Sequence, residues 1–129
     1  MRLAILLGTA ALTIFTTAAF ADDYVGGAIK SSEIGGKEVL TDANGMTLYT
    51  YDKDTAGVSN CYEQCAVNWP PLFVYDGAAA EGDFTIVERT DGTKMWAYKG
   101  MPLYLWVKDT KPGDTTGDGV GEVWHTAVE

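Results

Sequence analysis

Cys61 and Cys65 are the side chains of this sequence with the clearest capacity for chemistry. On an α-helix, Cα atoms four residues apart are separated by about 6 Å, which a disulfide can bridge. We therefore predict a structural disulfide between them that pins one short helical turn. The alternative is a redox pair or a thiolate metal site, although redox cysteines usually have two intervening residues beside a βαβ pattern, which this sequence lacks.

The single histidine, His125, follows Trp124 in a predicted strand. One histidine supplies neither a catalytic triad nor a two-histidine metal site, and strand alternation places it on the face opposite Trp124. We therefore predict an exposed surface residue. The alternative is a soft copper site formed by His125, Met46, Met101 and the cysteines. Both methionines follow a turn glycine, where they would equally serve as packing residues.

A loop rich in aspartate and glycine runs from residue 109 to residue 122. Its carboxylates Asp114, Asp118 and Glu122 offer the oxygen ligands that calcium prefers. The spacing does not match an EF-hand, which requires regularly placed acidic residues and a glutamate at its last position. Ordinary turn chemistry explains the same composition. Calcium is therefore the alternative reading, and no cofactor other than such a metal ion is predicted.

The elements that would position these residues are organised by an internal repeat. The segment beginning at Gly45 recurs at Gly100, with methionine, leucine, tyrosine, a second aromatic residue and Lys-Asp-Thr at the same spacings. The same offset relates Trp69 to Trp124. Such a period indicates a duplicated unit of supersecondary structure. We predict structural roles for the repeated residues, namely Tyr49, Tyr51, Asp54, Trp69, Tyr104, Trp106, Asp109 and Trp124.

Asp54 and Asp109 each close a repeated strand. A carboxylate at such a place can accept hydrogen bonds from neighbouring backbone N–H groups, and this is sufficient reason for an acidic residue there. The two would form a catalytic carboxylate pair only if the repeats brought them together, a relation that the sequence does not specify.

Each repeat is predicted to contain short antiparallel strands, on the basis of alternating hydrophobicity and turn residues. The predicted strands cover residues 38–41 and 46–51 in the first copy, and 84–89, 94–98, 101–107 and 123–128 in the second. Residues 60–67 are predicted to form the one helix, with Asn60 as N-cap and Glu63 at N3, and the Trp-Pro-Pro segment stops it. Residues 22–37 are predicted to be a flexible lead-in with an edge strand at most.

The first 21 residues predict export. Arg2 precedes an apolar run over residues 3–20 that ends in Ala-Phe-Ala, which is typical of a signal peptide cleaved after Ala21. The chain carries a net charge of −9, and such a surface repels nucleic acid and anionic lipid. We expect a soluble periplasmic or secreted protein with no nucleic-acid partner and no membrane insertion after cleavage.

Several segments together resemble the secreted-repeat family of bacterial periplasmic proteins and lipoproteins. The family's Tyr-x-aromatic-x-x-Asp motif occurs at residues 49–54 and again at 104–109. Three further segments are also similar to the family, at residues 61–72, 89–93 and 112–124. The resemblance covers about residues 38–128 and implies export and a two-copy repeat. It implies no activity, because the family has no established biochemical function. The lipidated cysteine of the lipoprotein members is lacking here.

Taken together, these patterns predict a small mainly-β domain over residues 38–129, with repeats at about 38–75 and 84–129. Two meander-like repeats would form a sandwich or partly open barrel with one disulfide-pinned helix. No nucleophile elbow, phosphate loop or dinucleotide fingerprint occurs, so no catalytic residue is predicted. We expect a non-enzymatic exported binding module for a small molecule, a protein or a cell-envelope component. Its contact candidates are Tyr24, Tyr62, Tyr75 and Tyr98. The alternative is a redox or metal-handling protein.

Overall fold

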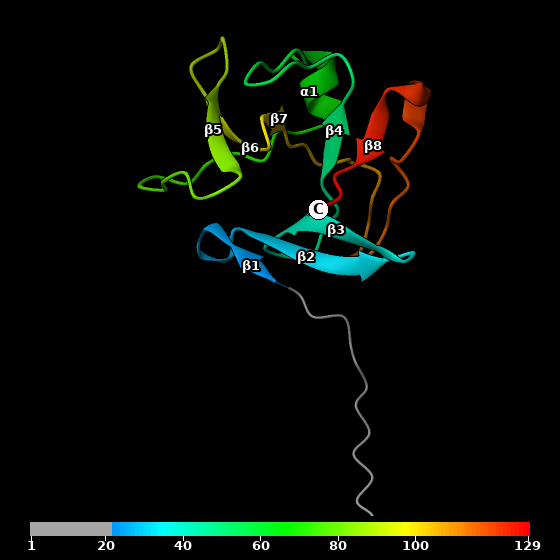
Figure 1. Cartoon of the computed structure of the whole chain (residues 1–129). Coiled ribbons are helices and arrows are strands. Elements are labelled where there is room, and N and C mark those ends of the chain that lie inside the picture. Colours follow the sequence, from blue (N-terminus) through cyan, green and yellow to red (C-terminus); the bar gives the residue numbers. More distant parts are fainter. Residues whose placement is uncertain (1–21) are drawn as a thin grey trace, which may run out of the picture.

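The computed structural model of the protein describes residues 22–129, and the predicted signal peptide lies outside these residues. The strands are β1 (Asp23–Tyr24), β2 (Ile29–Ile34), β3 (Lys37–Asp42), β4 (Tyr49–Tyr51), β5 (Phe84–Glu88), β6 (Lys94–Tyr98), β7 (Met101–Pro102) and β8 (Trp124–Thr126). They form three small antiparallel sheets, ordered β1-β2-β3, β4-β8 and β5-β6-β7 (Figure 1). The mainly-β class is confirmed. The strands that were predicted to form a sandwich or partly open barrel are divided among these three sheets.

The hairpin of β2 and β3 corrects the prediction for the start of the domain. All six residues of β2 pair with β3, from Ile29 opposite Asp42 to Ile34 opposite Lys37. Residues 22–37 are therefore not a flexible lead-in, and Ile29 is fully buried. This strand was not predicted because Ser31, the buried position that follows Ile29 on the same face, is polar and breaks the apolar alternation.

The sheet β5-β6-β7 is the meander predicted for the second copy. The strand predicted over residues 101–107 is shorter and ends at Pro102. Its continuation changes partner: the Leu103 N–H still donates to the Trp96 carbonyl at 2.9 Å, whereas the Tyr104 N–H donates to the Tyr49 carbonyl at 2.9 Å. The second copy thus leaves its own sheet and joins the first copy at Tyr104.

Each repeat adds its closing segment to the sheet of the other. The Leu72 carbonyl, from the first copy, accepts a hydrogen bond of 2.9 Å from the Trp96 N–H in β6. The Ala127 carbonyl, at the equivalent place in the second copy, accepts one of 2.9 Å from the Leu40 N–H in β3. The same exchange joins β4 of the first copy to β8 of the second. The two repeats are therefore interlocked.

The α-helix α1 (Gln64–Asn68) begins later than predicted. Glu63 occupies the N-cap position with a φ of 56°, and no side chain caps the helix. The prediction of Asn60 as N-cap is wrong because Asn60 is held elsewhere. Its N–H donates to Asp54 at 2.7 Å and its side-chain amide donates to the Lys53 carbonyl at 2.8 Å. The helix ends just ahead of the Trp-Pro-Pro segment, as predicted. Two short 3₁₀ turns, η1 (Val25–Gly27) and η2 (Val120–Glu122), flank the strands.

Two hydrophobic clusters lie on opposite sides of the chain at β4. Leu48 packs in the first cluster, with Ile29, Leu40, Phe84, Trp96 and Leu103. Its neighbour Tyr49 packs in the second, with Cys61, Trp69, Met95, Tyr104 and Trp124. The predicted alternation of Leu48 and Tyr49 onto opposite faces is confirmed, because successive side chains of a strand point in opposite directions. The repeated aromatic residues gather in the second cluster.

Candidate functional site

The repeated tyrosines and aspartates form two buried hydrogen bonds that cross between the repeats. The Tyr49 hydroxyl donates to Asp109 Oδ2 at 2.7 Å. The Tyr104 hydroxyl donates to Asp54 Oδ2 at 2.6 Å. The backbones of the two tyrosines also pair, with N–H to carbonyl distances of 2.8 and 2.9 Å. We call these contacts the Tyr–Asp pairs; in each, the tyrosine of one copy binds the carboxylate of the other.

Burial sets the ionisation of the Tyr–Asp pairs. It raises the pKa of Tyr49 and of Tyr104 far above the ordinary phenol value, and the hydrogen bonds to the carboxylates act in the same direction. Burial also raises the pKa of Asp54, while the hydrogen bond from Tyr104 partly opposes this. Both phenols therefore carry their protons at neutral pH and remain hydrogen-bond donors.

Four aromatic rings stack in a single column through the second cluster. Trp69 lies between Trp106 and Trp124, with ring centroids 3.9 and 3.8 Å away. Trp124 stacks in turn on Tyr51 at 4.2 Å. The two inner rings are buried and the two outer rings are partly exposed. This aromatic column therefore joins two partly exposed rings through two buried ones.

Gly117 closes the space beside the aromatic column. Tyr49 meets the column edge-on, with its centroid 5.3 Å from that of Trp69. A Cβ on Gly117 would lie 2.8 Å from Trp69 Cη2, 2.9 Å from Tyr49 Cζ and 3.0 Å from Trp106 Cγ, so only glycine fits. The Gly117 N–H also donates to the Tyr49 hydroxyl oxygen at 3.1 Å.

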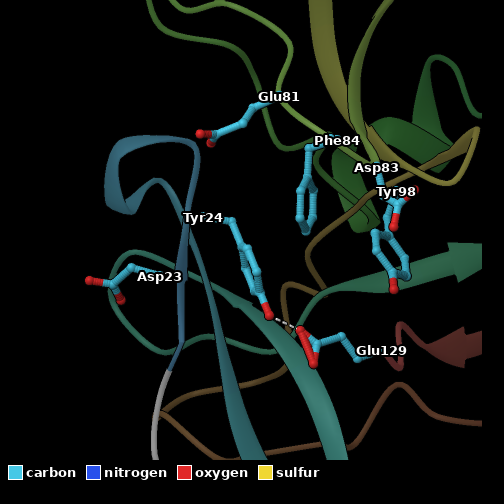
Figure 2. Close-up of a pocket in the computed structure, with 8 residues that line it drawn as sticks. Asp23, Tyr24, Glu81, Asp83, Phe84, Tyr98 and Glu129 are labelled. Carbon is cyan, nitrogen blue, oxygen red and sulfur yellow. Dashed lines mark hydrogen bonds between the residues drawn. The ribbon is translucent and has the colours of Figure 1, made fainter.

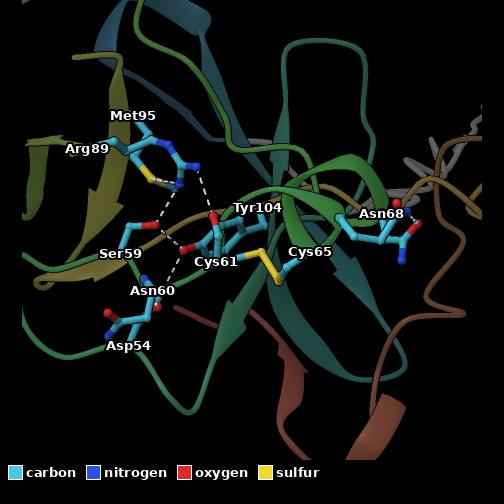
Figure 3. The surroundings of a disulfide bond; sticks show 10 residues. Asp54, Ser59, Asn60, Cys61, Cys65, Asn68, Arg89, Met95 and Tyr104 are labelled. Atoms are coloured by element: carbon cyan, nitrogen blue, oxygen red, sulfur yellow. Dashed lines mark hydrogen bonds between the residues drawn. A yellow bond between two sulfur atoms is a disulfide. The ribbon is translucent and has the colours of Figure 1, made fainter. Parts of the chain in front are cut away.

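Arg89 is a buried charge beside one Tyr–Asp pair that sequence reasoning missed (Figure 3). Its guanidinium donates to Ser59 Oγ at 2.7 Å and to the Cys61 carbonyl at 2.8 Å. Because the Tyr104 proton goes to Asp54, the Ser59 hydroxyl is the donor in its 2.6 Å contact with the Tyr104 oxygen. The Arg-x-Asp-Gly-Thr segment at residues 89–93 was the signal that could have marked this arginine.

Cys61 and Cys65 form the predicted disulfide, with Cα atoms 5.3 Å apart (Figure 3). Cys61 lies ahead of α1 and is fully buried, whereas Cys65 lies within the helix and is partly exposed. The Cys65 carbonyl accepts a hydrogen bond of 2.7 Å from the Trp69 N–H. The disulfide therefore fixes the turn that carries Trp69 into the aromatic column. Both sulfurs are bonded to each other, so neither is a thiolate ligand.

The remaining residues of the copper alternative have local partners. His125 is exposed on β8, as predicted, and its Nε2 lies 2.9 Å from Asp52 Oδ2. The N–H of Met46 donates to a carboxylate of its own turn at 2.9 Å. Met101 lies in β7 opposite Tyr98. His125 and Met101 thus lie in different strands and Met46 lies in the loop between β3 and β4, and the copper site stays a prediction.

The acidic residues of the 109–122 loop bind backbone groups. Asp114 Oδ2 accepts hydrogen bonds from the N–H groups of Thr110 and Lys111 at 2.9 and 3.2 Å. These bonds, first of all that from Thr110, lower the pKa of Asp114 to about 2. Asp118 Oδ1 accepts from the Thr126 N–H at 3.1 Å. Asp114 thus has the turn-stabilising role that the sequence offered as the explanation other than calcium, whereas Asp118 joins the loop to β8.

Within residues 22–129, Asp114, Asp118 and Glu122 do not form a three-carboxylate group. The group that the structure does bring together consists of Asp22, Glu38 and Glu129, with ligand oxygens within 4.8 Å of one another. Exposed carboxylates often gather without binding an ion, so this group is not assigned as a metal site. Calcium at the 109–122 loop stays a prediction.

A pocket of about 390 Å³ lies beside β1 and β5 (Figure 2). It is lined by Asp23, Tyr24, Glu81, Gly82, Asp83, Phe84, Tyr98 and Glu129. Four of these residues are acidic and three are aromatic, and none is basic. The rings form a row, with Phe84 centroid distances of 4.9 Å to Tyr24 and 5.1 Å to Tyr98. We call this site the acidic aromatic pocket.

Two hydrogen bonds hold the wall of the acidic aromatic pocket. The Tyr24 hydroxyl donates to the Glu129 carboxylate, and this bond raises the pKa of Tyr24 to about 12. Glu81 Oε1 accepts from the Val25 N–H at 2.9 Å, which ties η1 to the segment ahead of β5. Sequence reasoning named Tyr24 and Tyr98 as contact candidates. It missed Phe84 and the carboxylates, because their segments meet only in the folded chain.

The two other contact candidates lie outside the pocket. Tyr75 is 53% exposed, as a contact residue would be. Tyr62 is partly buried, and the Arg89 guanidinium lies 4.1 Å from the centroid of its ring. Tyr62 therefore covers the buried arginine.

Comparison with known proteins agrees with the structural repeat. A family model described as a secreted repeat of unknown function matches the chain twice, over residues 28–73 and 85–128. The first match begins directly ahead of β2, ten residues before the start that the sequence patterns predicted. No curated protein and no solved structure matches the chain. In the part of the chain that the structure describes, no helix has the length and hydropathy to cross a membrane.

Proposed function

Because the chain belongs to the secreted-repeat family, we propose that it is an exported binding module. We further propose that its acidic aromatic pocket binds a positively charged organic group. The observation that carries this proposal is the lining of the pocket, which combines four carboxylates and three aromatic rings with no basic side chain. Its volume of about 390 Å³ lies within the range of small-molecule sites.

The chemistry of the lining favours an organic cation over a neutral or anionic ligand. A cation above an aromatic face is attracted by the negative face of the ring, and carboxylates add a direct Coulomb attraction. The chain already makes such a contact at the edge of the site, where Lys99 Nζ lies 5.2 Å from the centroid of the Tyr98 ring. A ligand with an ammonium or guanidinium group on an apolar body would use both parts of the lining.

The pocket is held together before any ligand arrives. The bond from Tyr24 to Glu129 holds β1 against the last residue, and the bond from the Val25 N–H to Glu81 holds η1 against the segment ahead of β5. Binding then requires little ordering of side chains, which is a main cost of association. The net charge of −9 would raise the rate at which cations reach the surface.

Calorimetric titration with arginine amide, spermidine and tetramethylammonium tests this proposal. We expect binding that weakens with added salt, because the attraction is partly electrostatic. Tyr98→Leu should weaken it by about 0.5–2 kcal/mol through loss of the ring face. Asp83→Asn should weaken it by removing one carboxylate without changing the shape of the pocket.

Two matched controls separate pocket binding from general attraction to an acidic surface. Glu88→Gln removes an exposed carboxylate of β5 outside the pocket, and Tyr75→Leu removes an exposed aromatic ring outside it. Both controls should bind as the wild type does. The proposal fails if none of the three cations binds, or if Glu88→Gln weakens binding as much as Asp83→Asn.

A further inference from the structure

We propose that the aromatic column and the two Tyr–Asp pairs form a site of one-electron oxidation. An oxidant removes an electron from a partly exposed end of the column. Electron transfer along the column then leaves a tyrosyl radical at Tyr104 or Tyr49. This inference is independent of the acidic aromatic pocket. It concerns the second hydrophobic cluster, which has no part in the proposed binding site.

The column has the geometry of a path for electrons. Indole and phenol are among the side chains most easily oxidised by one electron, and transfer between them is fastest when their π systems are in contact. The Trp69 and Trp124 rings are nearly parallel, with an interplanar angle of 3° and centroids 3.8 Å apart. Trp106 and Tyr51 extend the stack at its two ends, with interplanar angles of 25° and 13°. Within the column, only these two outer rings are accessible to a reagent in solution.

The Tyr–Asp pairs are where the stable radical forms. An oxidised phenol is a very strong acid, so a tyrosine gives up its electron readily only when a base stands ready for its proton. Asp54 lies 2.6 Å from the Tyr104 hydroxyl, and Asp109 lies 2.7 Å from that of Tyr49. Tyr104 meets Trp124 edge-on at 5.2 Å, so one of these tyrosines lies against each inner indole of the column. Burial shields the resulting radicals from solvent.

The reaction balances with one external oxidant and no bound cofactor. A one-electron oxidant, such as a small radical or a high-potential metal complex, removes an electron from the indole of Trp106 or the ring of Tyr51. The inner indoles pass an electron to this oxidised ring, and Tyr104 then passes an electron to the indoles. The Tyr104 proton passes to Asp54 at the same time. The products are a reduced oxidant, a neutral tyrosyl radical and a neutral carboxylic acid, and a one-electron reductant such as a thiolate reverses the process.

Flash oxidation of the disulfide-intact chain by a photogenerated ruthenium(III) polypyridyl complex tests the proposal. Electron paramagnetic resonance of freeze-trapped samples should show a tyrosyl radical in the wild type. The Tyr49→Phe/Tyr104→Phe variant should lose this signal and show a tryptophan radical in its place. The matched control Tyr62→Phe/Tyr75→Phe, which alters tyrosines outside the column, should keep it. A tyrosyl signal that survives in the Tyr49→Phe/Tyr104→Phe variant would overturn the proposal.

A second variant tests the path without touching the buried hydrogen bonds. Replacing both outer rings, as Tyr51→Leu/Trp106→Leu, leaves the Tyr–Asp pairs intact and removes the accessible ends of the column. We expect a loss of tyrosyl yield at the same dose of oxidant, while Phe73→Leu, at an exposed ring outside the column, keeps the wild-type yield. Equal yields in the wild type and the doubly substituted column would contradict the proposed path, whatever the stability of the tyrosine variants.

Discussion

Gly117 shows how a single residue without a side chain sets the packing of many. Three aromatic rings converge on its Cα, and the nearest ring atom would lie 2.8 Å from an added Cβ. The residue is buried, and its N–H also donates to the Tyr49 hydroxyl oxygen. In the sequence it is one glycine among several in an acidic loop, with nothing to distinguish it.

We predict that Gly117→Ala destabilises the protein by about 1–3 kcal/mol, because the extra methyl overpacks a core that cannot move aside. Urea denaturation followed by tryptophan fluorescence measures the change in the free energy of unfolding. Thr115→Ala, in the same loop, is the control and should change it little. A Gly117→Ala protein as stable as the control would show that the column can shift to accept a methyl group.

The Tyr–Asp pairs show what the motif could and could not reveal at the residue scale. The repeated spacing marked Tyr49, Tyr104, Asp54 and Asp109 as structural residues. It did not indicate that each tyrosine binds the aspartate of the other copy. A linear motif suggests partners within itself, whereas these partners lie 60 and 50 positions apart.

At the scale of elements, predictions held where local chemistry decides. The meander β5-β6-β7 was recognised because turn residues separate strands with clear alternation. The hairpin of β2 and β3 was missed because Ser31 occupies a buried position. The cap of α1 was misplaced because Asn60 is engaged by Asp54, a partner from a neighbouring turn. In both cases an interaction outside the predicted element overrode its local preference.

The disulfide and α1 act together as one element. We predict that Cys61→Ala/Cys65→Ala lowers the free energy of unfolding by about 2 kcal/mol, the value expected for so short a closed loop. The near-ultraviolet circular dichroism of the stacked indoles should also weaken, because Trp69 is carried by the turn that the disulfide fixes. An unchanged spectrum would mean that packing alone holds Trp69 in place. Reducing agent added to the wild type should reproduce both effects and leave the double variant unaffected.

The whole molecule is two interlocked repeats, neither of which is complete. Each contributes a closing segment to the other's sheet and one aspartate to the other's tyrosine. Neither of the resulting clusters belongs to one copy alone: Leu48 and Trp96 share the first, and Tyr49 and Trp124 share the second. The acidic aromatic pocket also combines distant segments, namely β1, the segment around β5, Tyr98 and Glu129.

We predict that fragments 22–76 and 77–129 do not fold separately and associate when mixed. The cut falls within a segment that contains no helix or regular strand, so it opens one turn, closed by the Ala78 N–H to Tyr75 carbonyl bond, and removes no strand pairing. Heteronuclear NMR spectra of each fragment alone and of the mixture measure this directly. A fragment with a dispersed spectrum on its own would contradict the interlocked arrangement. The intact chain cleaved at the same point is the control.

The sequence by itself determined the mainly-β class, the two-copy repeat, the disulfide and the end of the helix. These depend on periodicity, spacing and backbone stereochemistry, which are local properties of the chain. Only the tertiary structure decided that the repeats exchange segments, that four aromatic rings form one column and that Phe84 joins four carboxylates in a pocket. These features arise from contacts between distant residues, and a pattern of residue types does not specify which of many chemically suitable partners the fold brings together.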